Sequence, residues 1–308
     1  MAEQVVIPGS LGEASSLLTA RPVGLVPFQI RGQVLALQGA EAGIDAAVPV
    51  VADYFVGAVL DLPSADVPVT VRMLDDWGVD MEAVVVEAAR NRAQVEASVD
   101  AFEEALVISG VSFAAASLRD PGAVSRFREG ATPVIVVPDA GTVVLGFAED
   151  PGSLVSAARA VERVLAQSSH TVSVTALVRS ESGWVPFEWP EAVSAEVSRL
   201  GKRWDSVQYG AARTVVQESY AAAGSDVFVA ELVLAADATG EYVTYASVTE
   251  GAVSVVPRAQ FLVLNAADGR IGQVPFGRVL DAGVLAPAPG TVPDYFSVTR
   301  FPAELLGS

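Results

Sequence analysis

The chain has no cysteine, one histidine (His170) and one lysine (Lys202) among its 308 residues. Without cysteine it can form no disulfide, no thiol nucleophile and no thiolate metal site. One histidine excludes sites that need two imidazoles, and no G-x-S-x-G segment supplies a serine for a triad with His170. Most catalytic and metal-binding motifs are therefore missing, and we expect neither a cofactor nor a metal site.

Long apolar runs are also absent, although 51% of the residues are hydrophobic and the mean hydropathy is +0.43. Asp45, Asp53 and Asp61 interrupt one apolar stretch, and no segment reaches the roughly 18 apolar residues of a spanning helix. The net charge of −18 argues against binding to nucleic acid or to an anionic membrane. The first residues, Met1-Ala-Glu-Gln-Val, lack the basic and apolar regions of a signal peptide. We therefore expect a cytoplasmic protein that binds neither membrane nor nucleic acid.

The apolar residues that are present predict alternating strands and helices. Segments rich in Val, Leu and Phe predict strands at residues 24–36, 48–62 (with some helical character) and 69–74. Helical spacing predicts a helix from Met81 that resumes through Val95, Val99, Phe102 and Leu106. A hairpin at Thr132–Phe147, a helix capped by Ser153 and a strand at 171–178 follow. This order predicts an α+β fold with helices packed on mostly antiparallel sheets.

Trp184-Val-Pro-Phe-Glu-Trp-Pro190 predicts a hinge between two regions, 1–183 and 184–308, because its prolines hold the backbone extended. A helix is expected next, from Val193 through Trp204 towards Ala222, unless Gly201 or Gly210 breaks it. Alternating apolar residues then predict an antiparallel meander at 227–274 and a Pro-rich arm from residue 286.

The segment Leu74-Asp-Asp-Trp-Gly-Val-Asp-Met-Glu-Ala, followed by Ala88-Ala-Arg-Asn91, resembles the signature of the YtpQ-like family of uncharacterised bacterial proteins. In that family a strand leads to a Trp-Gly turn and a helix that ends in an Ala/Asn pattern. Trp77, Gly78, Asp80 and Asn91 carry the resemblance, which extends over residues 24–178, while the family's usual Leu after the Asn is here Arg92. The resemblance implies a small α+β domain related in outline to secretion-chaperone-like folds, and it implies no catalytic residue.

Asp75, Asp76, Asp80 and Glu82 form a local carboxylate cluster in this segment. Paired carboxylates can bind a divalent cation or perform acid–base chemistry. Asp80 also suits a helix N-cap and Asp75-Asp76 the start of a turn, and we favour this structural interpretation. Trp77 is expected to anchor the helix against the sheet.

Two groups of residues are candidates for binding a partner. The basic group on the helix after the hinge is either a solvated face paired with glutamates or a docking patch for an acidic partner. Its members are Arg199, Lys202, Arg203 and Arg213. The aromatic group is expected to pack between the two regions, or to supply hot spots if it is exposed. Its members are Trp184, Phe187 and Trp189.

The missing chemistry and the abundant apolar surface favour a non-catalytic protein-binding module of an adaptor, chaperone-like or immunity type. Its partner would be another protein or a second copy of the chain in a homodimer. One alternative is an enzyme that uses Asp75, Asp76 and Asp80, with or without a divalent metal. The other is a domain that binds a small molecule in a pocket between the two regions.

Overall fold

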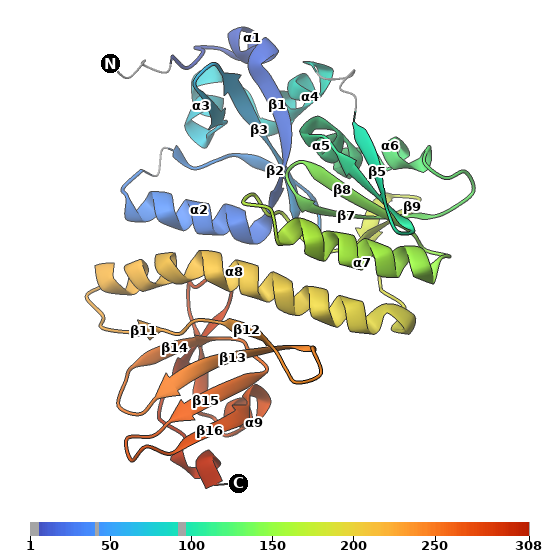
Figure 1. Cartoon of the computed structure of the whole chain (residues 1–308). Coiled ribbons are helices and arrows are strands. Elements are labelled where there is room, and N and C mark those ends of the chain that lie inside the picture. The colour runs from blue at the N-terminus through green and yellow to red at the C-terminus, as the bar shows by residue number, and fades with distance from the viewer. Residues whose placement is uncertain (1–5, 41–42, 92–96, 308) are drawn as a thin grey trace. The chain divides into compact units, whose positions relative to one another are not determined.

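The structure is a computed structural model that describes residues 6–40, 43–91 and 97–307 (Figure 1). The chain divides into two compact units, Met1–Leu200 and Gly201–Ser308. The predicted α+β fold is confirmed, because the helices accompany sheets that are mostly antiparallel. Among the described strands, only the pairs β11–β14 and β13–β15 are parallel.

The first unit contains most of the helices. Its elements are α1 (Leu11–Ala14), β1 (Leu18–Gly24), α2 (Leu25–Leu37), β2 (Ala47–Val51), β3 (Tyr54–Leu62), β4 (Ala65–Pro68), α3 (Val71–Trp77), α4 (Met81–Asn91), β5 (Ser98–Phe102), β6 (Ala105–Ser109), α5 (Val111–Arg119), α6 (Gly122–Ser125), β7 (Pro133–Asp139), β8 (Thr142–Phe147), α7 (Pro151–Leu165), β9 (Leu177–Ser180), β10 (Gly183–Pro186) and the start of α8 (Ser194–Ala222). Short 3₁₀ turns lie at Ser15–Leu17 and Glu191–Val193.

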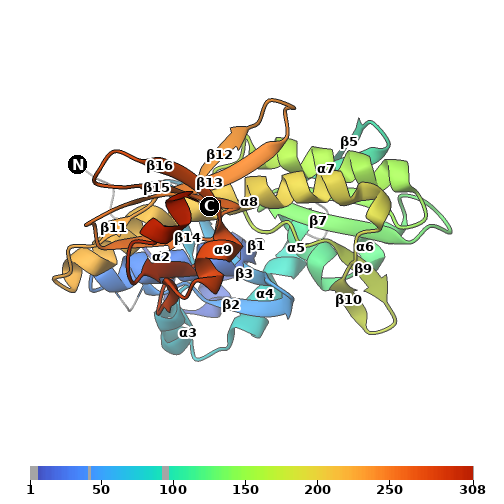
Figure 2. The ribbon, with the colours of Figure 1, turned by 90° about the horizontal axis from the view of Figure 1, so that it is seen from below.

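Two sheets organise this unit. In the first, β3 pairs with β1 along one edge and with β2 and β4 in succession along the other. The second has the order β10-β9-β7-β8-β6-β5, and Figure 2 shows β10 and β5 at its opposite sides. The hairpin predicted at Thr132–Phe147 is confirmed as β7 and β8, in the middle of this sheet.

The hairpin is buried on both faces, and the side-chain period of two assigns alternate residues to two cores. Ile135, Val137 and Leu145 belong to the core that also contains the first sheet, α4 and α5. Val134 and Val136 are buried on the other face, where α7 covers the sheet. Each buried Val or Leu side chain stabilises the fold by about 1.5–3 kcal/mol relative to exposure.

Residues 172–175 join the two sheets. Gly24, at the end of β1, lies so close to Val172 that a Cβ on it would be 1.8 Å from the Val172 carbonyl oxygen. Tyr54 is fully buried, donates its hydroxyl proton to the Thr175 carbonyl (2.7 Å) and accepts from the Val137 N–H (3.1 Å). Burial raises the pKa of the Tyr54 hydroxyl, so the group stays neutral and keeps both hydrogen bonds.

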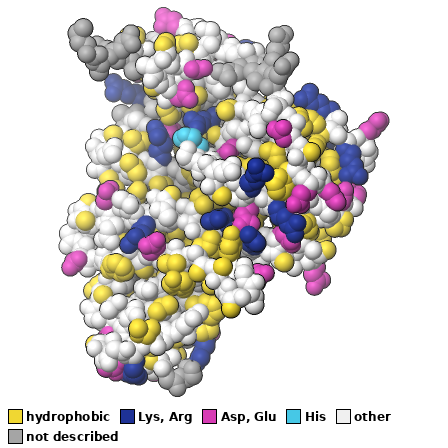
Figure 3. Space-filling view, in the orientation of Figure 1, with side chains coloured by type: hydrophobic (Ala, Val, Ile, Leu, Met, Phe, Trp, Pro, Cys, Tyr) yellow, Lys and Arg dark blue, Asp and Glu magenta, His cyan; other side chains and the backbone are white. Residues whose placement is uncertain are grey.

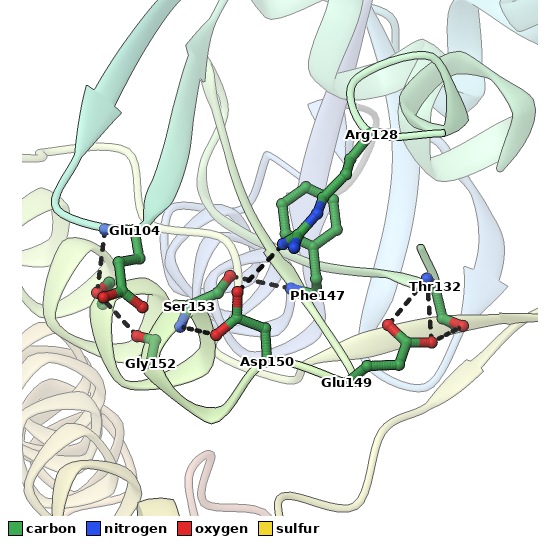
Figure 4. Close-up of polar contacts among 9 residues, drawn as sticks. Glu104, Arg128, Thr132, Phe147, Glu149, Asp150, Gly152 and Ser153 are labelled. Carbon is green, nitrogen blue, oxygen red and sulfur yellow. Dashed lines mark hydrogen bonds and ion pairs between the residues drawn. The ribbon is translucent and has the colours of Figure 1, made fainter. Parts of the chain in front are cut away.

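The connection from β8 to α7 is fixed by polar contacts (Figure 4). The Thr132 N–H donates to both carboxylate oxygens of Glu149, at 3.2 and 3.1 Å. Asp150 caps α7 by accepting from the Ser153 N–H (3.1 Å), and its other oxygen binds Arg128 (3.1 Å). The predicted helix is therefore confirmed, but its N-cap is Asp150 and not Ser153.

The second unit contains the rest of α8 and two four-stranded sheets of order β11-β14-β18-β17 and β12-β13-β15-β16. Tyr209 of α8 stacks edge-on against Tyr295 (5.1 Å between centroids) and donates its hydroxyl to the Asp294 carbonyl (2.8 Å). The elements of this unit after α8 are β11 (Phe228–Val229), β12 (Val233–Ala236), β13 (Tyr242–Thr249), β14 (Ser254–Pro257), β15 (Phe261–Asn265), β16 (Ile271–Pro275), α9 (Phe276–Asp281), β17 (Leu285–Ala288), β18 (Tyr295–Val298) and a 3₁₀ turn at Ala303–Gly307.

Several element predictions are wrong. Residues 25–37 and 71–77 form the helices α2 and α3 where strands were predicted. The predicted continuation of the helix through Val99, Phe102 and Leu106 is the hairpin β5–β6, and Val95 lies outside the described residues. The strand predicted at 171–178 forms only from Leu177.

The predicted boundary between the two regions and the predicted elements of the C-terminal region also differ in detail from the structure. The expected hinge at 184–190 begins with strand β10, and the boundary between the units falls inside α8, which neither Gly201 nor Gly210 interrupts. The expected meander includes parallel pairs, and part of the Pro-rich arm is strand β17. No helix among the described residues is long and apolar enough to cross a membrane.

Candidate functional site

The Trp-Gly segment forms a turn between two helices. Gly78 ends α3 in the left-handed conformation (φ 66°), and Asp80 accepts from the Ala83 N–H (2.8 Å) at the start of α4. Trp77 is half-buried and donates its indole N–H to the Pro8 carbonyl (2.9 Å). Asn91, at the end of α4, donates to the carbonyls of Ser15 and Leu18. These contacts hold the N-terminal segment to α3 and α4, which is a structural role.

The carboxylates of this segment do not converge. Asp75 and Asp76 are exposed, and Asp76 lies 3.8 Å from Arg72 one turn earlier. In the part of the chain that the structure describes, no group of three or more His, Asp or Glu side chains could hold a metal ion.

The aromatic group separates into a buried member and a half-buried pair. Trp184 lies in β10, is 8% exposed and donates its indole N–H to the Ser117 carbonyl (2.7 Å). Its ring therefore belongs to the core of the first unit. Phe187 and Trp189 contact each other edge-on at 5.6 Å.

The basic group is already engaged by neighbouring residues. The Arg199 guanidinium lies 2.9 Å from Glu162 of α7, and the Lys202 ammonium donates to the Tyr242 carbonyl (2.6 Å). Arg203 lies 5.7 Å from the ring centroid of Tyr242. Arg213 donates to the Val229 carbonyl (3.2 Å) and lies 3.4 Å from Glu231. The four cations therefore do not form one free patch along α8.

A groove that the sequence did not indicate lies between α4 and α5. Its volume is about 390 Å³, and half of its lining residues are alanines. Ala20, Ala88 and Ala115 are buried at its floor, whereas Ala89 and Ala116 are exposed at its sides. Alanine is the strongest helix former, so α4 and α5 remain stable although their small side chains leave the space between them open.

The rim of the groove is polar and carries two arginines and the carboxylate of Asp120, which accepts from the Gly122 N–H (2.8 Å). Arg119 is paired with Glu82 of α4. Arg126 lies 5.8 and 5.2 Å from the ring centroids of Phe113 and Phe127, and it makes no ion pair with any residue that the structure describes. The Ser112 hydroxyl, also in the groove, is buried without a hydrogen-bond partner. An apolar floor, an unpaired cation and an unsatisfied hydroxyl together suit an amphipathic ligand with negative charge.

The only signal of this groove in the sequence is the alanine content of residues 88–89 and 114–116. Helical spacing places such alanines on one face, but it does not show that two alanine faces meet. The groove is therefore a product of tertiary packing.

Comparison with models of known protein families, with curated proteins and with solved structures gives no match to this chain.

Proposed function

We propose that this protein is a non-catalytic binding module that receives an apolar, acidic segment of a partner protein in the groove between α4 and α5. The observation that carries the proposal is the open alanine-lined space beside the Arg126 guanidinium, which makes no ion pair with any described residue. Helices with apolar anchors bind in such grooves, and small side chains on the floor allow close approach.

The charge of the partner follows from the rim of the groove. In a chain with 37 acidic and 19 basic side chains, most of the surface repels an acidic segment. Arg126 offers a local exception, because a guanidinium without a carboxylate can form a bidentate pair with one. A partner segment with acidic residues beside its apolar anchors is therefore guided to this groove and away from other faces.

The adaptor, chaperone-like or immunity-type role, the relation to the YtpQ-like family and a homodimeric state stay predictions. The alternative of a carboxylate-dependent enzyme is less favoured, because Asp75 and Asp76 are exposed and Asp80 caps a helix.

The test is site-specific photo-crosslinking, with a photoreactive residue placed at Ala116 or at Ala83. Both alanines are exposed, but only Ala116 lines the groove, so Ala83 on α4 is the matched control. We expect a crosslinked peptide from Ala116 and not from Ala83, and mass spectrometry should show that it is apolar and rich in Asp and Glu.

Substitutions give a second readout. With the photoreactive residue at position 116, Ala89→Leu fills the groove from the α4 side and should reduce crosslinking at least tenfold, whereas Ala83→Leu should leave it unchanged. Arg126→Glu should reduce it more at low salt than at high salt. Equal crosslinking at both positions, or crosslinking from position 116 that survives Ala89→Leu, would contradict the proposal.

A further inference from the structure

A second pocket of the first unit, with a volume of about 440 Å³, shares no residue with the alanine groove. Its walls come from β1, β3, β4, the turn between β7 and β8, and the segment after α7. The pocket holds three carboxylates beside one guanidinium and one imidazole; its polar residues are Thr19, Arg21, Asp61, Asp66, Asp139, Thr142, Ser168 and His170. The single histidine, drawn in cyan in Figure 3, lies on the face shown with Lys or Arg side chains close by.

Strand geometry aims two of these side chains into the pocket. Leu18 and Ala20 of β1 are buried in the core with α4 and α5. Because successive side chains of a strand point to opposite faces, Thr19 and Arg21 point away from that core, and both line the pocket.

Backbone hydrogen bonds hold the opposite wall in place. The Ala140 N–H donates to the His170 carbonyl (3.2 Å), which joins the segment after α7 to the β7–β8 turn. The His170 N–H donates to the Ser168 hydroxyl (3.1 Å), and the Gly141 N–H donates to the Asp139 carboxylate (2.9 Å). The position of His170 is therefore fixed by the fold, while its imidazole remains exposed.

Three hydrogen-bond donors in this pocket have no partner among the residues that the structure describes. Thr19 is 5% exposed, and its hydroxyl makes no hydrogen bond, which costs about 1–3 kcal/mol for a buried group. Neither the Arg21 guanidinium nor the His170 imidazole makes a hydrogen bond or an ion pair with any residue in the described part of the chain. Arg21 acts electrostatically on Asp45, but Arg31 already holds that carboxylate at 2.5 Å.

We infer that this pocket binds a small organic anion, either a carboxylate or a phosphate, whose remaining part carries amine or hydroxyl groups. Arg21 and His170 supply donors to the anionic group, and the Thr19 hydroxyl completes its buried side. Asp66 and Asp139 accept hydrogen bonds from the amine or hydroxyl groups of the ligand. The pocket is within the size range of small-molecule sites.

Because His170 is the only histidine of the chain, its imidazole Cε1 proton gives one unambiguous NMR signal. The full-length protein would be titrated at fixed pH with L-glutamate and with ribose 5-phosphate, which represent the carboxylate and phosphate arms. Inorganic phosphate is the reference anion without amine or hydroxyl groups. We expect a saturable shift of the His170 signal with one organic probe, at a concentration at least tenfold below that for inorganic phosphate.

Arg21→Gln should raise the apparent Kd at least tenfold, and Thr19→Val should raise it to a smaller extent. Arg72→Gln removes the same charge from an exposed position on α3 outside the pocket and should leave the titration unchanged. The amide spectrum of each variant shows whether it is folded. If one of the two pocket variants does not fold, the other still tests the inference. A shift that does not saturate, saturation with inorganic phosphate alone, or an unchanged curve in both pocket variants would overturn the inference.

Discussion

Gly24 tests how the two sheets of the first unit are joined. In Gly24→Ala the new Cβ would lie 1.8 Å from the carbonyl oxygen of Val172, 2.7 Å from its carbonyl carbon and 3.1 Å from its Cα. All three are backbone atoms, so no side-chain rotation removes the overlap and the segment around Val172 must move.

The loss in the free energy of unfolding can be worked out from the hydrogen bonds that this movement weakens. Val172 and Ser173 donate to the carbonyls of Pro138 (2.8 Å) and Val137 (3.3 Å), so a shift weakens these bonds in addition to the overlap itself. Overpacking of this kind typically costs about 1–3 kcal/mol, and each of the two hydrogen bonds contributes about 1 kcal/mol, so we expect a loss of about 3–5 kcal/mol. In a unit of this size, that corresponds to a fall in Tm of roughly 6–20 °C.

The assay is urea unfolding followed by tryptophan fluorescence, since Trp77, Trp184 and Trp189 all lie in the first unit. Gly32→Ala is the matched control, because a Cβ there meets no atom within 4 Å and Gly32 is inside α2. It should stabilise the protein by about 0.5–1 kcal/mol. A Gly24→Ala protein as stable as its parent, or equal losses in the two variants, would refute the reasoning.

Two further predictions concern the same unit. Tyr54→Phe leaves the Val137 N–H without its partner in the core and should lower the free energy of unfolding by about 2–3 kcal/mol in the same urea assay. A change below about 0.5 kcal/mol would contradict this prediction, because it would show that the Val137 N–H finds another acceptor. Hydrogen bonds from Thr132 hold the pKa of Glu149 below its ordinary value, and the N-cap bond does the same for Asp150. Because these folded pKa values are lowered, the bonds stabilise the fold above the unfolded carboxyl values of about 4 and are lost as the pH falls through the folded values. The Tm of Thr132→Val should therefore lie below that of the parent by a constant amount above about pH 5, and the difference should disappear below about pH 4. A difference in Tm that does not depend on pH would contradict this explanation.

The elements predicted correctly are those whose local pattern and tertiary environment agree. The hairpin at Thr132–Phe147 has β-branched residues on both sides of a turn, and both of its faces are buried. Helix α8 keeps apolar residues at helical spacing for 29 residues, which outweighs Gly201 and Gly210.

The wrong predictions arise where residue type and local geometry disagree. Leu25–Leu37 is rich in apolar and β-forming residues, but Pro27 lies in the first turn of a helix, where proline is tolerated. Val99, Phe102 and Leu106 fit helical spacing, yet Glu103 adopts a positive φ (51°) in a turn that folds this stretch into a hairpin.

The candidate sites depend on long-range contacts that no local pattern encodes. Arg21 and His170 are separated by most of the first unit in sequence and line one pocket only because β1 and the segment after α7 meet there. Trp184 was expected at a hinge because of the prolines beside it, and its hydrogen bond to Ser117 shows instead that it belongs to the core.

The seam formed by residues 172–175 has a consequence for biosynthesis. Its bonds reach back to Asp53 and Tyr54, which precede their partners by 120 and 121 residues. At about 5–20 residues per second, a ribosome makes Tyr54 roughly 6–24 s before Thr175. During this interval the nascent chain contains the residues of β1–β4 but not yet residues 172–175, so the Tyr54 hydroxyl lacks its acceptor and is exposed to water. Apolar strand surface is therefore displayed at the ribosome for seconds, long enough for a nascent-chain chaperone to bind it before the first unit closes.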